Sequence, residues 1–287
     1  MSRQGGSLKD KLKSYKRTPG SFIVMLLVLM AAVITFAALL FLIAYILING
    51  VPYLKPSLFS FTYTSDNASL MPALINTVIM TALSLLIAAP LGIFSAIYLV
   101  EYAKRGNKLV EVIRLTTETL QGIPSIVYGL FGMLFFVTFC HWGFSILAGA
   151  FTLSIMVLPL IMRSTEEALK SVPDSYREGS FGLGAGKLRT VFRIVLPSAV
   201  PGILAGVILA VGRIVGETAA LIYTAGTLAK MPKNAMSSGR TLAVHMYNLA
   251  SEGLYVDQAY ATAVILLVLV VVINTLSGVA AKKLTKA

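Results

Sequence analysis

The stretch EGSFGLGAGKLRTVFRIVLP, residues 178–197, is a polar segment between long apolar runs. It contains four glycines and three basic residues, in a chain of 287 residues of which 57% are hydrophobic. Charges and irregular backbone of this kind are costly in the hydrocarbon core of a membrane. We therefore expect the segment to lie outside the bilayer, where another protein can bind it.

The composition is typical of a polytopic α-helical membrane protein. Charged residues make up 13% of the chain, about half the share that is usual in soluble domains, and the mean hydropathy is +0.83. Several uncharged apolar runs exceed about 18 residues, the length that indicates a membrane-spanning helix. We predict an all-α fold with six transmembrane helices, near residues 22–48, 73–100, 110–140, 143–162, 198–228 and 259–281.

The distribution of basic residues predicts which side of the membrane each loop occupies. Six spans would place both termini on one side. Eighteen of the 24 Lys and Arg residues fall in segments on that side, and four fall in the opposite loops. Because basic residues are enriched in cytoplasmic loops, both termini and the connection at residues 163–197 are predicted to be cytoplasmic.

Several classes of function are excluded by the sequence. The formal charge of +12 lies in short flanks beside apolar spans, so it does not indicate nucleic-acid binding. The single cysteine, Cys140, cannot form an internal disulfide. The sequence has no P-loop, nucleophile–base pair or metal-ligand spacing. His141 and His245 are interpreted as interfacial polar groups, His245 within a short helix near residues 241–250 that lies at the surface or in a pore mouth.

The cytoplasmic connection is predicted to form two short helices joined by a glycine turn. Asp174 follows a proline, and this pair is typical of a helix start. Glycine adopts the left-handed conformation that ends many helices, so Gly184 and its neighbouring glycines are expected to end the first helix. The second helix would continue as far as Pro197, where the next span begins.

The same segment resembles the cytoplasmic signature of the permease subunits of binding-protein-dependent ABC importers. That signature is an E-A-A tripeptide followed by G and then by I-x-L-P, and the matching positions here are Glu178, Gly184, Ile194, Leu196 and Pro197. Gly179 and Ser180 stand where the signature has two alanines. The resemblance implies a MetI-like, type I ABC importer fold, with a coupling helix that docks on an ATPase subunit. It assigns coupling roles to Glu178, Gly179, Ser180, Gly184, Ile194, Leu196 and Pro197.

Two Arg–Glu pairs with i,i+4 spacing are predicted inside the spans. Arg213 and Glu217 would share a helix face with a stripe of small residues that includes Gly202, Gly206 and Ala210. Charges at membrane depth normally face a bundle interior or a watery path. The pair is therefore either a structural link between helices or an anion site, since an arginine fork matches a tetrahedral oxyanion.

The second pair, Arg114 and Glu118, lies in the predicted span at residues 110–140, ahead of a break that we expect at Pro124. Arg114 is alternatively an anchor at the membrane interface, because a long basic side chain can reach the headgroups from within a span. Two such pairs would line a path for anions.

Three phrases resemble phosphate-specific permeases of the PstA type within this importer family. They are GIPSIVYGL at residues 122–130, GRIVGETA at 212–219 and TLAVHMYNLA at 241–250. The resemblance implies that Arg213 is needed for phosphate passage with Glu217 as its neighbour, and it extends the substrate path to Arg114 and Glu118.

The resemblance also implies the organisation and the partners of the chain. The expected parts are a basic cytoplasmic tail (1–20), a first transmembrane helix with a periplasmic loop (21–72), an ABC permease domain (73–281) and a cytoplasmic tail (282–287). The expected partners are a PstC-type permease as heterodimer, two PstB-type ATPases, a PstS-type phosphate-binding protein and the lipid of a prokaryotic inner membrane. ATP and magnesium would be used by the ATPase, and this chain would bind no cofactor.

Two alternatives remain open from the sequence. The same machine could carry another oxyanion, such as molybdate, sulfate or phosphonate. The chain could instead be an intramembrane lipid phosphotransferase that uses Arg213 and Glu217.

Overall fold

The computed structural model describes residues 19–104 and 106–286, with side chains from Gly20 to Val279 apart from residue 105. The predicted basic tail lies outside the described residues up to position 18, and so do the side chains of the predicted C-terminal tail. Within the described ranges every regular element is a helix. The predicted all-α class is confirmed.

The chain divides into two compact units, residues 1–49 and 50–287. The first unit contains almost all of helix α2 (Pro19–Gly50), which has 32 residues and is apolar on every side. None of its most apolar 18-residue window is buried in this chain. A long helix that is apolar all round is suited to lipid or to a helical partner.

The second unit contains the remaining helices and the short π-helical and 3₁₀ segments between them. In chain order they are η1 (Val51–Tyr53), η2 (Pro56–Phe59), α3 (Met71–Ile97), η3 (Tyr98–Tyr102), α4 (Lys108–Gln121), α5 (Ser125–Gly132), η4 (Met133–Phe139), α6 (Ile146–Lys170), α7 (Asp174–Gly182), α8 (Lys187–Thr190), η5 (Val191–Val195), α9 (Leu196–Val215), α10 (Ala219–Ile222), α11 (Leu242–Glu252) and α12 (Val256–Lys286).

Helix α6 is the centre of this unit. It packs against α3, α9, α4 and α5, and 67% of its most apolar window is buried. Large side chains such as Leu153, Met156 and Ile161 are fully enclosed there. Gly202 and Gly206 of α9 lie directly against Ala168 and Ser164 of α6. The stripe of small residues is therefore a helix-packing face, because small side chains let two helix backbones approach closely.

The membrane-spanning capacity of the helices agrees with the sequence-based count. Five helices in the described ranges are long and apolar enough to cross a membrane, and a sixth is added if α4 and the α5–η4 helix are taken as one span. That pair is bent by 103°. The bend lies at residues 122–124, where Pro124 was expected to break the span, so residues 110–140 are not a straight helix.

The span predicted at residues 198–228 departs further from the structure than the other predicted spans. Helix α9 ends at Val215, residues 216–218 are not helical, and α10 adds one further turn. Two glycines near this point, Gly212 and Gly216, weaken helix propensity. Helix α6 is in turn longer than the predicted span, since it extends to Lys170.

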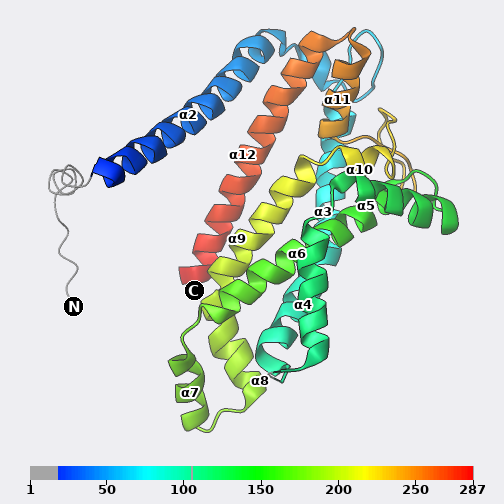
Figure 1. The fold of residues 1–287 in the computed structure, drawn as a ribbon. Helices are drawn as coiled ribbons and strands as arrows, with labels where there is room; N and C mark the ends of the chain where they lie inside the picture. The colour runs from blue at the N-terminus through cyan, green and yellow to red at the C-terminus, as the bar shows by residue number, and fades with distance from the viewer. Residues whose placement is uncertain (1–18, 105, 287) are drawn as a thin grey trace. The chain divides into compact units, whose positions relative to one another are not determined.

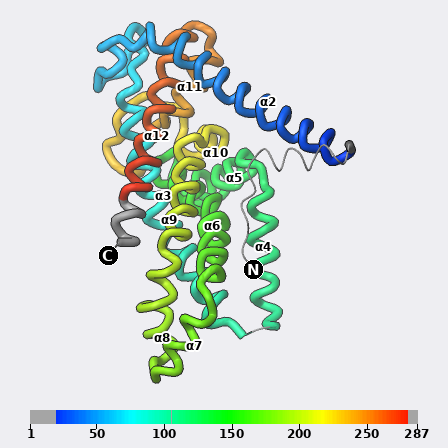
Figure 2. The backbone as a smooth tube through the Cα atoms, turned by 90° about the vertical axis from the view of Figure 1, so that its left-hand side faces the viewer, coloured from blue at the N-terminus to red at the C-terminus, as the bar shows by residue number. Residues whose placement is uncertain are grey.

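The second unit has two ends, which we call the α7 end and the α11 end. Helices α7 and α8 project beyond the long helices at one end, and α11 lies at the other (Figure 1). Figure 2 shows α4 running beside α6 towards the same end as α7. The short helix expected near residues 241–250 is confirmed as α11.

Candidate functional site

The connection between α6 and α9 forms the predicted helix, glycine turn and second helix. Helix α7 begins at Asp174, and Gly184 has a φ of +81°, a conformation that favours glycine. Ser180 is buried and its hydroxyl lies 2.8 Å from that of Thr190 in α8. This hydrogen bond ties the two short helices together, so that they form one projecting tip.

The tip exposes apolar side chains to the surroundings. Leu183 is 91% exposed and Leu188 is 66% exposed, and the rings of Tyr176 and Phe181 are about half exposed. Such a patch on a projecting element is typical of a protein-binding surface. Glu178 lies on the exposed surface of α7, and a side chain added at Gly179 would meet only open space.

The I-x-L-P positions lie at the root of the tip. Val191 and Val195 are buried against Ala168 and Leu169 at the end of α6. Ile194 and Leu196 are partly buried beside them, and Pro197 is an exposed residue in the first turn of α9. The segment η5 continues without interruption into α9, so the tip and α9 are joined by helical backbone.

Arg177, which the sequence analysis did not single out, attaches α7 to the transmembrane helices. Its Nη2 lies 2.7 Å from Glu101 Oε1 in η3 and donates to the Leu169 carbonyl, and its Nη1 donates to the Val172 carbonyl. The exposed fractions of the two charged side chains are 15% and 8%. We call this set of contacts the Arg177 clasp. It joins η3, the end of α6 and α7 through one guanidinium.

The predicted pairing of Arg114 with Glu118 is wrong. Arg114 Nε lies 3.3 Å from Glu166 Oε2 of α6, without the alignment of a hydrogen bond. Glu118 Oε1 lies 4.0 Å from Arg163 Nη1, also of α6. Both charges therefore interact across helices near the α7 end, and the exposed Glu118–Arg163 pair contributes little to stability.

The predicted pairing of Arg213 with Glu217 is also wrong. Glu217 follows the end of α9, is 8% exposed, and its Oε1 accepts a hydrogen bond of 3.0 Å from the Ala220 amide. It therefore satisfies an amide in the first turn of α10, and the i,i+4 geometry of a continuous helix does not apply. Among the described residues no carboxylate lies within 4.0 Å of the Arg213 guanidinium.

Arg213 instead lines an open groove of about 520 Å³ between α6, α9 and α12. The other lining residues are apolar or glycine except Asn274 of α12, which the sequence analysis did not identify. Arg213 is also close enough to Tyr128 of α5 for the guanidinium to interact electrostatically with the phenol. The groove thus presents one unpaired cation and one amide on a largely apolar wall.

His245 is fully buried in α11, so its interpretation as an interfacial group is wrong. In the described residues no group of three or more His, Cys, Asp and Glu side chains could hold a metal ion. The arrangement therefore concentrates its polar features in the tip, the Arg177 clasp and the Arg213 groove.

Comparison with known proteins assigns this architecture to a family. Residues 88–286 match the model of the family described as binding-protein-dependent transport system inner membrane component. The chain belongs to this family. It is an ABC importer permease subunit, and the members of this family are transport subunits and not enzymes, which removes the phosphotransferase alternative. Importer permeases of this kind work with ATPase and substrate-binding subunits.

Individual relatives agree with this assignment. The permease is 38% identical over 246 residues to the probable ABC transporter permease protein YqgI of Bacillus subtilis. The aligned region covers 79% of this chain and 82% of YqgI. It is 40% identical over 161 residues to the phosphate transport system permease protein PstA 2 of Mycobacterium bovis. This aligned region covers 56% of this chain and 53% of PstA 2. The permease therefore matches about half the length of that phosphate permease.

A solved structure supports the MetI-like fold. A chain of the MetNI methionine ABC transporter, in an inward-facing conformation, superposes with a TM-score of 0.59 at 20% identity and covers 75% of the permease and 94% of that chain. The likeness concerns the fold alone, since the identity is low.

Proposed function

We propose that this chain is a transmembrane permease subunit of an ATP-driven importer that moves inorganic phosphate inward across the cytoplasmic membrane. The named PstA relatives support phosphate as the cargo. The observation that carries the proposal is the Arg213 guanidinium, which lies in a groove of the transmembrane helices with no carboxylate partner among the described residues. An unpaired cation at membrane depth is costly, and such residues commonly mark a substrate or ion pathway.

The chemistry of the groove suits a tetrahedral oxyanion. An arginine fork donates two parallel hydrogen bonds to such an anion. Asn274 would add an amide donor from α12, and the apolar remainder of the wall would keep the anion from binding too tightly to leave. The groove is open on one side, so we assign its opposite wall to a homologous, PstC-type permease. Arg114 and Glu118 lie outside this groove and would take part only near the α7 end.

The exposed tip would dock on one of two PstB-type ATPase subunits. Glu178 and the exposed apolar side chains would contact the ATPase, while Ser180 and Gly184 would hold the shape of the tip. ATP with magnesium would be bound and hydrolysed by the ATPases, and this chain would bind no cofactor. From Leu196 to Arg213 the helix rises about 26 Å, so movement of the tip would be carried directly to the groove.

The transport cycle follows from this connection. ATP binding would draw the coupling helices together and open the groove outward to receive phosphate from a PstS-type binding protein, and hydrolysis would return it to the inward state. The excess of basic residues supports an orientation with both termini and the α7 end in the cytoplasm. Lipid would surround the apolar faces, and nucleic acid is not a partner.

Competition between anions tests the cargo. Vesicles that contain the whole transporter would be supplied with the binding protein, ATP and radiolabelled phosphate, with sulfate, molybdate or a phosphonate as unlabelled competitor. We expect ATP-dependent phosphate uptake that unlabelled phosphate suppresses and the other anions do not. Uptake of one of those anions in place of phosphate would contradict the proposed cargo.

A further inference from the structure

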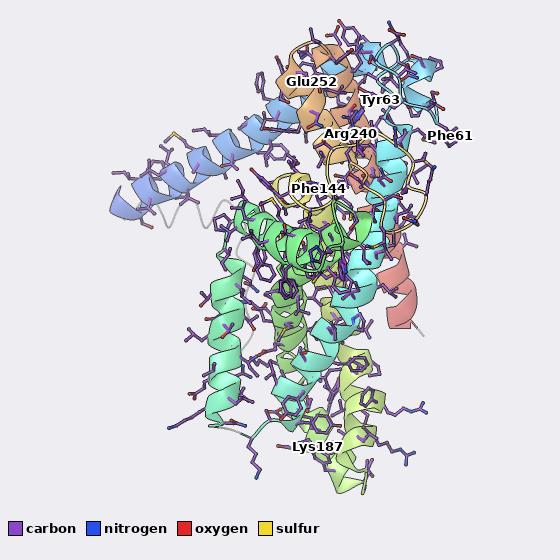
Figure 3. All side chains as sticks on the ribbon, turned by 90° about the vertical axis from the view of Figure 1, so that its right-hand side faces the viewer. Phe61, Tyr63, Phe144, Lys187, Arg240 and Glu252 are labelled. Atoms are coloured by element: carbon purple, nitrogen blue, oxygen red, sulfur yellow. The ribbon has the colours of Figure 1, made fainter. Side chains whose placement is uncertain are left out.

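A second unpaired arginine lies at the α11 end, away from the Arg213 groove. Arg240 immediately precedes Thr241 and α11, and its side chain is placed beside Tyr63, at the opposite end of the unit from Lys187 (Figure 3). Arg240 is 5% exposed, Thr241 is 2% exposed and His245 is fully buried. These three side chains therefore form a buried polar cluster, which we call the Arg240 cluster.

Several polar atoms of the Arg240 cluster lack hydrogen-bond partners among the described residues. Arg240 Nε and Nη2 and the Thr241 hydroxyl are buried without a hydrogen-bond partner. The ring nitrogens of His245 make no hydrogen bond of full geometry, although the Ala68 carbonyl lies beside the ring. No carboxylate lies within 4.0 Å of the Arg240 guanidinium among the described residues. The guanidinium lies over the Tyr63 ring, whose centroid is 4.8 Å from Cζ.

The two free nitrogens of Arg240 have a particular geometry. Nε and Nη2 form the side edge of the guanidinium, which donates two parallel hydrogen bonds to one oxyanion. Arginine does not deprotonate in proteins, so burial cannot neutralise it. A buried charge without a counter-charge is strongly destabilising, and the face of one aromatic ring compensates only part of that cost.

The backbone around the cluster is fixed by independent hydrogen bonds. The Asn76 side chain of α3 donates to the Arg240 carbonyl over 3.1 Å, and the Leu242 amide donates to the Thr77 hydroxyl over 2.8 Å. The Arg240 amide donates to the Leu228 carbonyl. The backbone that carries the Arg240 fork is therefore held in place before any ligand binds.

The geometry points to a second anion site, in which the Arg240 side edge binds a tetrahedral oxyanion bidentately while the Thr241 hydroxyl donates to one of its remaining oxygens. The identity of the anion as inorganic phosphate rests on the proposed function. The cluster is enclosed by the chain, so the segment that carries Tyr63 or α11 must move for the anion to exchange. The site would hold phosphate at the α11 end before it reaches Arg213.

Hydrogen exchange of the purified complex, without ATP or binding protein, tests this site locally. The amide exchange of residues 240–252 is compared in inorganic phosphate, sulfate and chloride at equal ionic strength. We expect phosphate to slow this exchange several-fold in the wild type and in Arg213→Gln, and to have no such effect in Arg240→Gln. Lys233→Gln is the matched control, because it removes an exposed charge from the same connection.

Two further variants keep the test decisive if Arg240→Gln does not assemble. Arg240→Lys retains the charge but loses the fork, and Thr241→Val retains the shape but loses one donor. Each is expected to raise the phosphate concentration needed for protection by about tenfold, as the loss of one charge-assisted hydrogen bond predicts.

The possible outcomes separate the site from the proposed cargo. Absence of phosphate protection in the wild type, or its persistence in Arg240→Lys and Thr241→Val, would overturn the site. Equal protection by chloride would overturn an oxyanion site. Protection by sulfate alone that depends on Arg240 would support the oxyanion site and contradict phosphate as the cargo.

Discussion

The buried side chain of His245 makes the stability of the α11 end depend on pH. Burial, together with the positive charge of Arg240, lowers the pKa of His245 from 6.5 to about 3. The Tyr63 ring lies edge-on at 6.1 Å. The folded chain therefore keeps this imidazole neutral at pH values at which the unfolded chain protonates it.

This shift predicts a loss of stability in mild acid. The unfolded state binds a proton near pH 6.5 and the folded state only near pH 3, so the contribution of His245 to stability is present above pH 6.5 and falls as the pH decreases through this window. The melting temperature of the complex, measured from pH 7.5 to pH 5, should fall more steeply for wild type than for His245→Gln. The exposed His141→Gln serves as control; equal slopes for wild type and His245→Gln would contradict the assignment.

Residue spacing along the sequence did not predict the charge pairs. Arg114 and Glu118 have the spacing of a helical ion pair, but their partners, Glu166 and Arg163, come from α6. A pairing between two helices depends on packing that spacing within one segment does not contain. The Arg213 and Glu217 prediction failed because it assumed a continuous helix through Gly216. The importance of Arg213 itself remains a prediction.

Among the elements, α7 is held by the Arg177 clasp at its root and is free at its tip. The guanidinium contacts Glu101 and two carbonyls at the end of α6, whereas Leu183 and Leu188 face outward. An element fixed at one side and exposed at the other can transmit force from a partner to the helices behind it. We therefore propose that the clasp positions α7 for coupling.

Loss of the clasp should reduce transport more than ATP hydrolysis. Glu101→Gln or Arg177→Met would release α7 from η3, so the ATPases would still turn over while less phosphate moves per ATP. The measurement is the ratio of phosphate transported to ATP hydrolysed in the same vesicles. Asp174→Asn is the control. Asp174 also pairs with Arg177, but its side chain is 81% exposed, and exposed ion pairs contribute little to stability. An unchanged ratio in both clasp variants would exclude the positioning role.

Substitution of two glycines of the tip by alanine should have opposite effects on stability. Gly179 lies in α7 with open space at its Cβ position, so Gly179→Ala should stabilise the helix by up to about 1 kcal/mol and leave uptake unchanged. Gly184 has a φ of +81°, so Gly184→Ala should strain the turn and lower uptake. Thermal unfolding and uptake of both variants check this; equal behaviour of the two would contradict the turn geometry.

The elements of the tip were predictable because their signals are local. Asp174 after proline and the glycine at position 184 set a helix start and a left-handed turn without help from distant residues. The end of α9 at Val215 was not predicted, although Gly212 and Gly216 near it weaken helix propensity.

At the scale of the whole molecule, the class and the number of apolar spans follow from composition and run length. The bend of 103° between α4 and α5 shows the limit of that argument, since length and hydropathy do not distinguish a straight span from a broken one. The family assignment adds the function of the assembly, and the Arg213 groove supplies the proposed path within it.

The central claim is that phosphate passes along the Arg213 groove. The most direct test is ATP-dependent phosphate uptake by the complete transporter carrying Arg213→Gln, with Lys233→Gln as the charge-removal control and with ATP hydrolysis measured in parallel. We predict that Arg213→Gln assembles and hydrolyses ATP but loses phosphate uptake, while the control transports normally. Wild-type uptake by Arg213→Gln would contradict a phosphate path along this groove.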